Sequence, residues 1–98
     1  MFPRTVPAAE ALELGLVNRV VSEAELPTVV GELARSLAAG PTLAYGAIRR
    51  SVAFSAGHPL SESLAQEAEQ MAVTGASADH GAAVAAFLAK EKPTFQGR

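Results

Sequence analysis

The sequence predicts a mostly α-helical chain of about five helices, with one short extended segment near residues 16–21. Apolar residues recur at three- and four-residue spacing, the helical period, between glycine and proline residues that end each run. Alanine, which has the highest helix propensity, accounts for 21 of the 98 residues. The run at residues 16–21 is apolar and rich in β-branched side chains, which favours a short strand or an extended link.

Two predicted helices flank the extended segment. The first has Pro7 in its first turn, and Gly15 ends it because glycine readily takes the left-handed conformation. The second begins at Ser22 and Glu25, which match a capping box: each side chain accepts a bond from a free amide of the first turn. Gly40 and Pro41 end this second helix, and its apolar face comprises Leu26, Val29, Val30, Leu33 and Leu37.

Three further helices are predicted after Pro41. The third begins with Pro41 in its first turn and runs to about Phe54; after a break at residues 55–59, the fourth runs from Leu60 to Gly75. The last has Ser77 as its N-cap, and the Asp79 charge favours its first turn through the helix macrodipole. Pro93 ends it and leaves a short tail, and its apolar stripe comprises Val84, Phe87 and Leu88.

Composition excludes several classes of function. A formal net charge of −2 gives no basic surface for nucleic acid. The absence of cysteine excludes disulfides, zinc–thiolate sites and a thiol nucleophile, and predicts a cytoplasmic protein. No apolar stretch is long enough for a membrane span, so we expect no membrane partner. Because alanine buries little area, the chain is expected to need a partner to complete its core.

Acidic pairs are the first candidates for acid–base chemistry. Glu10 and Glu13 share a helix face, and Glu67 and Glu69 lie close together on the fourth helix. Nothing around them indicates the burial that raises a carboxyl pKa, so solvated helix faces are the simpler interpretation.

Histidines, serines and arginines give no stronger site. His58 and His80 have no second ligand at helical spacing, so we predict no metal site. No nucleophile-elbow or phosphate-loop motif surrounds any serine or glycine. A helix-turn-helix over residues 33–54, with Arg49 and Arg50 as phosphate contacts, is disfavoured by Gly46 and the acidic balance.

The last helix offers one binding candidate. Phe87 and Lys90 are three residues apart, so a continuous helix would place the ring and the cation on one face. Such a pair can stack on a nucleobase and reach an adjacent phosphate. The alternative is a core phenylalanine beside a lysine whose stem lies along the apolar surface, and spacing alone favours that alternative.

Residues 8–21, AAEALELGLVNRVV, resemble the segment that follows the catalytic core in the enoyl-CoA hydratase/isomerase (crotonase) superfamily. The segment LARSLAAGPTLAYGAIRRSV is similar to the helix–Gly-Pro–helix connection of that family. The end of the chain also resembles the family, through Ser77, Asp79, Ala86–Phe87, Lys90 and the residues 93–97, PTFQG. Where the family commonly has Arg-Glu-Gly, this chain has Gly81–Ala82–Ala83.

The resemblance implies a helical C-terminal region of a crotonase-like fold, which in the family packs on a neighbouring subunit. It implies that Phe87 and Lys90 contact the adenine and phosphate end of coenzyme A held by that neighbour. A coenzyme A thioester would be the substrate of the parent family, with no covalently bound cofactor, and the expected partner is a second copy of the chain in a homo-oligomer.

The family's oxyanion-hole loops and catalytic glutamates lie upstream of the matched region. We therefore predict no catalytic residue among residues 1–98, and an isolated chain without hydratase or isomerase turnover. Met1–Phe2 fall where a family member would still be closing an upstream helix, so we expect a single helical segment that is the end piece of a longer protein. The alternative function is a stand-alone helical self-association module with no ligand.

Overall fold

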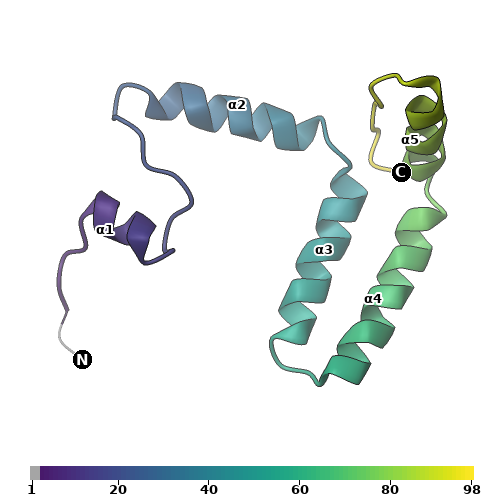
Figure 1. Ribbon diagram of the computed structural model, residues 1–98, viewed down its shortest axis with the longest axis horizontal. Helices are drawn as coiled ribbons and strands as arrows, with labels where there is room; N and C mark the ends of the chain where they lie inside the picture. Colours follow the sequence, from purple (N-terminus) through teal and green to yellow (C-terminus); the bar gives the residue numbers. More distant parts are fainter. Residues whose placement is uncertain (1–2) are drawn as a thin grey trace. The chain divides into compact units, whose positions relative to one another are not determined.

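The computed structural model describes residues 3–98, so the expectation for Met1 and Phe2 lies outside the described residues. Those residues form five helices and no β-strand, which confirms the mostly helical prediction (Figure 1). Residues 16–21 are an irregular link. No helix in the described part of the chain is long and apolar enough to cross a membrane. The helices are α1 (Ala8–Glu13), α2 (Leu26–Ala38), α3 (Thr42–Ser55), α4 (Leu60–Gly75) and α5 (Ala78–Ala89).

The chain divides into two compact units, and the boundary between them falls at a residue of α2. The first ends at Leu33, and the second comprises Ala34–Arg98. The expectation of one helical segment over residues 1–98 stays a prediction.

Helix α1 ends as the glycine signal predicts. Gly15 has a φ of +70°, and its N–H donates to the Leu12 carbonyl at 3.0 Å. The next amide, that of Leu16, donates to the Ala11 carbonyl at 2.8 Å. These two bonds make a Schellman motif, which satisfies carbonyl groups that the end of the helix would leave free.

The predicted capping box is formed just before α2. The Glu25 amide donates to Ser22 Oγ at 3.3 Å, and the Ser22 amide donates to Glu25 Oε2 at 3.2 Å. The Ser22 hydroxyl also donates to the same carboxylate oxygen at 2.6 Å. The local sequence therefore fixes where α2 begins.

The capping box makes the start of α2 sensitive to acid. Hydrogen bonds from the Ser22 hydroxyl and amide hold the pKa of Glu25 below its ordinary value of 4.5. Because the folded chain binds this proton less readily than the unfolded chain, the contribution is complete above about pH 4.5 and is lost as the pH falls through the lowered pKa. We expect amide protection at the start of α2 to fall in that window in an NMR titration. The step should vanish in Glu25→Gln and persist in Glu23→Gln, and an unchanged step in Glu25→Gln would contradict the assignment.

Three helices begin directly after a proline. Pro7, Pro41 and Pro59 are the N-caps of α1, α3 and α4. The carbonyl of each accepts the first intrahelical bond, at 2.9 to 3.0 Å. The sequence predicts Pro7 and Pro41 inside the first turn, which is one position further into each helix than the observed N-cap position. Either position tolerates proline, because the first turn needs no donor from that residue.

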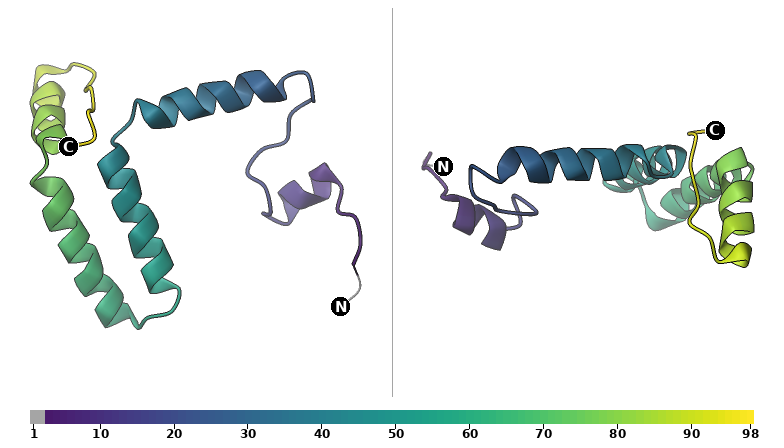
Figure 2. Two further views of the ribbon diagram at one scale, coloured as in Figure 1. Left: turned by 180° about the vertical axis from the view of Figure 1, so that it is seen from behind. Right: turned by 90° about the horizontal axis from the view of Figure 1, so that it is seen from above.

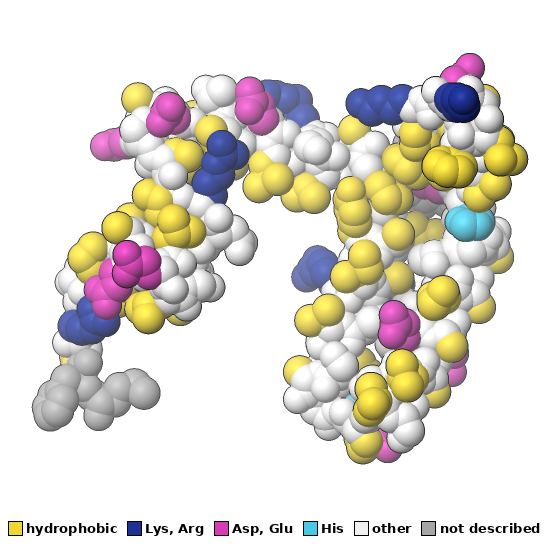
Figure 3. Space-filling view, in the orientation of Figure 1, with side chains coloured by type: hydrophobic (Ala, Val, Ile, Leu, Met, Phe, Trp, Pro, Cys, Tyr) yellow, Lys and Arg dark blue, Asp and Glu magenta, His cyan; other side chains and the backbone are white. Residues whose placement is uncertain are grey.

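Helices α3 and α4 pack side by side and antiparallel in the second unit, as two views show (Figures 1 and 2). Arg50 Nε donates to Gln70 Oε1 across the pair at 2.9 Å. Among residues 3–98 only Ala47 and Asp79 are buried, each with 6% of its surface exposed. Apolar side chains are exposed along α3, α4 and α5 (Figure 3), so this unit forms little core from its own residues.

Candidate functional site

The start of α5 is held by a side-chain cap. The His80 amide donates to Ser77 Oγ at 3.1 Å, and the Ser77 hydroxyl donates back to the Thr74 carbonyl at 2.6 Å. This confirms Ser77 as the predicted N-cap. The second bond also ties the end of α4 to the start of α5.

Asp79 binds the end of the chain. Its Oδ1 accepts from the Gln96 amide at 2.7 Å, and its Oδ2 accepts from the Gly97 amide at 2.8 Å. The Asp79 amide donates to the Arg98 carbonyl at 2.9 Å. The tail therefore returns along α5 to the beginning of that helix (Figure 2). We call residues 77–98, closed by these three bonds, the α5–tail hairpin.

Helix α5 ends earlier than the sequence predicts. The expected end was Pro93, but the last helical residue is Ala89. Lys90 takes the left-handed conformation, with φ +58° and ψ +34°. Its amide donates to the Phe87 carbonyl at 3.1 Å, and the Glu91 amide donates to the Ala86 carbonyl at 2.8 Å. This is the same Schellman motif that ends α1, with a lysine in the place of Gly15.

Both predicted binding residues are solvent-exposed. The Phe87 side chain is 80% exposed, so the described residues do not make it part of a core. Lys90 is exposed at the turn of the α5–tail hairpin. The Lys90 amide donates a backbone hydrogen bond to the Phe87 carbonyl. The sequence predicts the two residues as neighbours on one face of a continuous helix, whereas the helix ends at Ala89. An exposed aromatic ring and an exposed cation at the same end of one helix are the residue types that bind a nucleobase and its phosphate.

The tail packs near α3 and α5 through Phe95. This half-buried ring lines a cavity of about 300 Å³ with Leu43 and Ala44 of α3 and with Ala83 of α5. Gly97 has a φ of +77°, a conformation that other residues avoid, and a side chain there would approach Thr42 Oγ1. The tail is thus held by backbone geometry and apolar contact as well as by Asp79.

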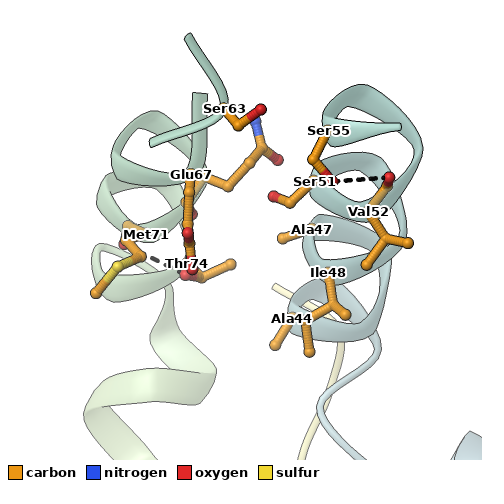
Figure 4. Close-up of a pocket in the computed structure, with 11 residues that line it drawn as sticks. Ala44, Ala47, Ile48, Ser51, Val52, Ser55, Ser63, Glu67, Met71 and Thr74 are labelled. Atoms are coloured by element: carbon orange, nitrogen blue, oxygen red, sulfur yellow. Dashed lines mark hydrogen bonds between the residues drawn. The ribbon is translucent and has the colours of Figure 1, made fainter. Parts of the chain in front are cut away.

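A groove of about 330 Å³ lies between α3 and α4 (Figure 4). Small and apolar side chains of α3, among them Ala47 and Ser51, line it on one side, and residues of α4, among them Glu67, line it on the other. Glu67 is the single carboxylate that lines this groove, and Glu69 is not among its lining residues. The structure therefore does not bring the predicted pair together in this groove.

The other acidic pair lies at the surface. Glu10 binds the Arg4 guanidinium with two hydrogen bonds, at 2.8 and 2.5 Å. This pairing lowers the pKa of Glu10 and raises that of Arg4. Glu13 is exposed. A carboxylate with a lowered pKa is a poor proton acceptor at neutral pH, so the surface interpretation of this pair fits the structure.

The two histidines take part in different local structures. The His58 ring stacks on Phe54 with centroids 3.6 Å apart, and its Nδ1 lies 2.6 Å from the Phe54 carbonyl oxygen. His80 lines the cavity beside Phe95. Within residues 3–98, no group of three histidine or acidic side chains is placed to hold a metal ion.

Sequence reasoning missed the structural role of Asp79. It was assigned to the first turn of α5 for its favourable charge, whereas its carboxylate binds amides 17 and 18 residues away. The available signal was the pair of short motifs, Ser77–Asp79 and Gln96–Gly97, that the family resemblance had matched separately. Local spacing cannot link them, since a helix cap is a short-range pattern.

The helix order and the α5–tail hairpin define the helical C-terminal region of a crotonase-type protein. The sequence profile of the enoyl-CoA hydratase/isomerase family matches residues 1–98, and the chain belongs to that family.

Characterised relatives differ in the reaction they catalyse. The chain is 35% identical over 91 residues to the 1,2-epoxyphenylacetyl-CoA isomerase of Escherichia coli, covering 93% of this chain and 35% of the relative. It is 35% identical over 88 residues to a 4-chlorobenzoyl coenzyme A dehalogenase of an Arthrobacter species, covering 90% and 32%. The chain thus spans about a third of the length of these relatives.

A solved structure agrees with the fold. An enoyl-CoA hydratase/isomerase of Mycobacterium abscessus superposes with a TM-score of 0.93 at 43% identity, covering 97% of this chain and 36% of that one.

Proposed function

We propose that this chain is the part of an acyl-CoA-processing protein that completes a coenzyme A pocket and assembles a homo-oligomer. The single observation that carries the proposal is the exposed Phe87 ring beside the Lys90 turn at the end of α5. The names of the relatives support the proposal, since each name includes a coenzyme A thioester as the compound acted on. Phe87 would stack on the adenine, and Lys90 would bind the adjacent phosphate.

The exposed apolar surface supports assembly. Leu60 on α4 is 74% exposed, and Leu88 on α5 is 76% exposed. Large apolar side chains exposed on several helices favour contact with a partner, because their burial removes apolar surface from water. We propose a second copy of the chain as the partner, as in the symmetric oligomers that most such assemblies form. Cytoplasmic localisation stays a prediction from the cysteine-free composition.

Titration with coenzyme A tests the pocket. Because one stacked base and one ion pair contribute only a few kcal/mol, we expect the 98-residue chain to bind coenzyme A with a Kd on the order of 1 mM. NMR should show saturable shifts at Phe87 and Lys90, which Phe87→Ala and Lys90→Ala each abolish. Leu60→Ala is the matched control on another exposed apolar side chain and should leave them intact. Shifts that do not saturate, or that survive Phe87→Ala, would overturn the proposed contact.

Turnover is expected to be absent from residues 1–98 alone. The purified chain should not hydrate crotonyl-CoA, since the family's oxyanion donors and glutamates are not among the matched residues. Turnover that disappears when a residue of this chain is substituted would sink this part of the proposal.

The second candidate function is a self-association module with no ligand. The exposed apolar faces of α3, α4 and α5 favour this function. It does not, however, give a role to the exposed Lys90 at the end of α5. Sedimentation at increasing concentration should show an oligomer under either function. Only the coenzyme A titration separates the two, because a pure self-association module gives no saturable response at Lys90.

A further inference from the structure

We propose that Asp79 is a positioning residue for the coenzyme A contact: by holding the tail, it keeps Lys90 in the left-handed conformation, which sets the direction of its side chain relative to Phe87. The inference rests on the proposed function, in which Lys90 binds phosphate. It adds a residue that does not touch the ligand but decides where the cation lies.

The bonding pattern carries the first step. The α5–tail hairpin is closed at one end by the three Asp79 bonds to Gln96, Gly97 and Arg98. Its other end is the turn at Lys90, where the chain reverses direction. With the tail fixed at the start of α5, the chain must reverse between Ala89 and Gln96, and Lys90 is the residue at which α5 ends and the backbone turns.

The burial of Asp79 carries the second step. Its carboxylate lies in a residue that is only 6% exposed, and each of its oxygens accepts a backbone amide. Bonds to an ionised acceptor are about twice as strong as bonds between neutral groups. The carboxylate is therefore a firm anchor for the tail rather than a transient surface contact.

The conformation of Lys90 carries the third step. Lys90 is the only non-glycine residue with positive φ in the described part of the chain. A left-handed lysine is disfavoured by a factor of about 5 to 30 against its ordinary conformations, because Cβ approaches the following carbonyl oxygen. Something must hold it there, and the Schellman bonds of α5 act from one side while the Asp79 anchor acts from the other.

The direction of the side chain depends on this φ, since rotation about the Lys90 backbone redirects its Cα–Cβ bond. If the anchor is lost, the competent fraction of the chain falls toward the unrestrained population. The apparent Kd rises in inverse proportion to that fraction. Because the Schellman bonds still favour the turn, the steric factor of about 5 to 30 is the upper limit of the weakening of coenzyme A binding.

Asp79→Asn tests the inference in the 98-residue chain. Asparagine keeps the shape but replaces one acceptor oxygen with an NH₂ group, which opposes a backbone N–H. We expect the Lys90 Cα and Hα shifts to move away from their left-handed values and the coenzyme A Kd to rise several-fold, within the upper limit given above. Ser77→Ala is the matched control: it removes a cap from the same turn of α5 without touching the tail, so both readouts should stay as in the wild type.

The outcomes separate the two proposals. If Asp79→Asn leaves the Lys90 shifts and the Kd unchanged, the positioning role is wrong while the proposed pocket stands. If Ser77→Ala weakens binding as much as Asp79→Asn, Asp79 acts only through helix stability, and the inference is also wrong. If the wild type shows no saturable response at Lys90, the proposed function fails, and the positioning role falls with it.

Discussion

Replacing Asp79 with alanine is expected to destabilise the second unit by about 3 kcal/mol, because two hydrogen bonds to an ionised carboxylate are lost together. The bonds join Oδ1 to the Gln96 amide and Oδ2 to the Gly97 amide. Asp79 is one of two buried residues in the described chain, so few other contacts can compensate. For a unit with little core, this loss is a large fraction of the total free energy of unfolding.

Two measurements check this expectation. Denaturant unfolding gives the change in the free energy of unfolding, and hydrogen exchange reports locally on the Gln96 and Gly97 amides. Both amides should lose protection in Asp79→Ala even where the helices persist. Ser77→Ala, which removes an ordinary N-cap, should cost only about 1 kcal/mol and leave the two amides protected. Full protection of Gln96 and Gly97 in Asp79→Ala would show that the anchor lies elsewhere.

The same bonds show how far the sequence could predict this structure. Helix α4 runs from Leu60 to Gly75 in both the prediction and the structure. Pro59 marks its start through the fixed φ of proline, whereas Gly75 is its last residue and does not take the left-handed conformation. The Ser22–Glu25 capping box was also predictable, since its partners are three residues apart. Signals confined to one turn of helix can be read without knowledge of the fold.

The candidate site was predictable only in part. Phe87 and Lys90 were found from their spacing and from the family resemblance, yet the geometry assumed for them was a helix that continued to Pro93. The helix ends at Ala89 instead, and Lys90 reverses the chain. A lysine gives no local signal for a left-handed turn, because the conformation is unfavourable for it. The Schellman bonds at the end of α5 hold it, together with the proposed action of the Asp79 anchor on the distant tail.

Replacing Lys90 with glycine is expected to stabilise the chain while abolishing coenzyme A binding. Glycine adopts the left-handed conformation without steric cost, which removes about 1–2 kcal/mol of strain. It also gives the unfolded chain more conformational freedom, which offsets about 0.5–1 kcal/mol. The net gain is about 0.5–1 kcal/mol, or roughly 5 °C in Tm for a domain of this size. Gly15, which ends α1 with the same bonds, shows the residue that this motif ordinarily selects.

The controls for Lys90→Gly separate strain from composition. Glu91→Gly places glycine one residue later, where the backbone φ is not positive, and should destabilise the chain by about 0.5–1 kcal/mol. Lys90→Ala removes the cation but keeps the Cβ, so it should abolish the coenzyme A response without raising Tm. A Tm that falls in Lys90→Gly would contradict a strained lysine at this turn. A Tm that rises while binding is lost would mean that the chain retains an unfavourable residue at Lys90 because its cation is needed there, a trade of stability for binding.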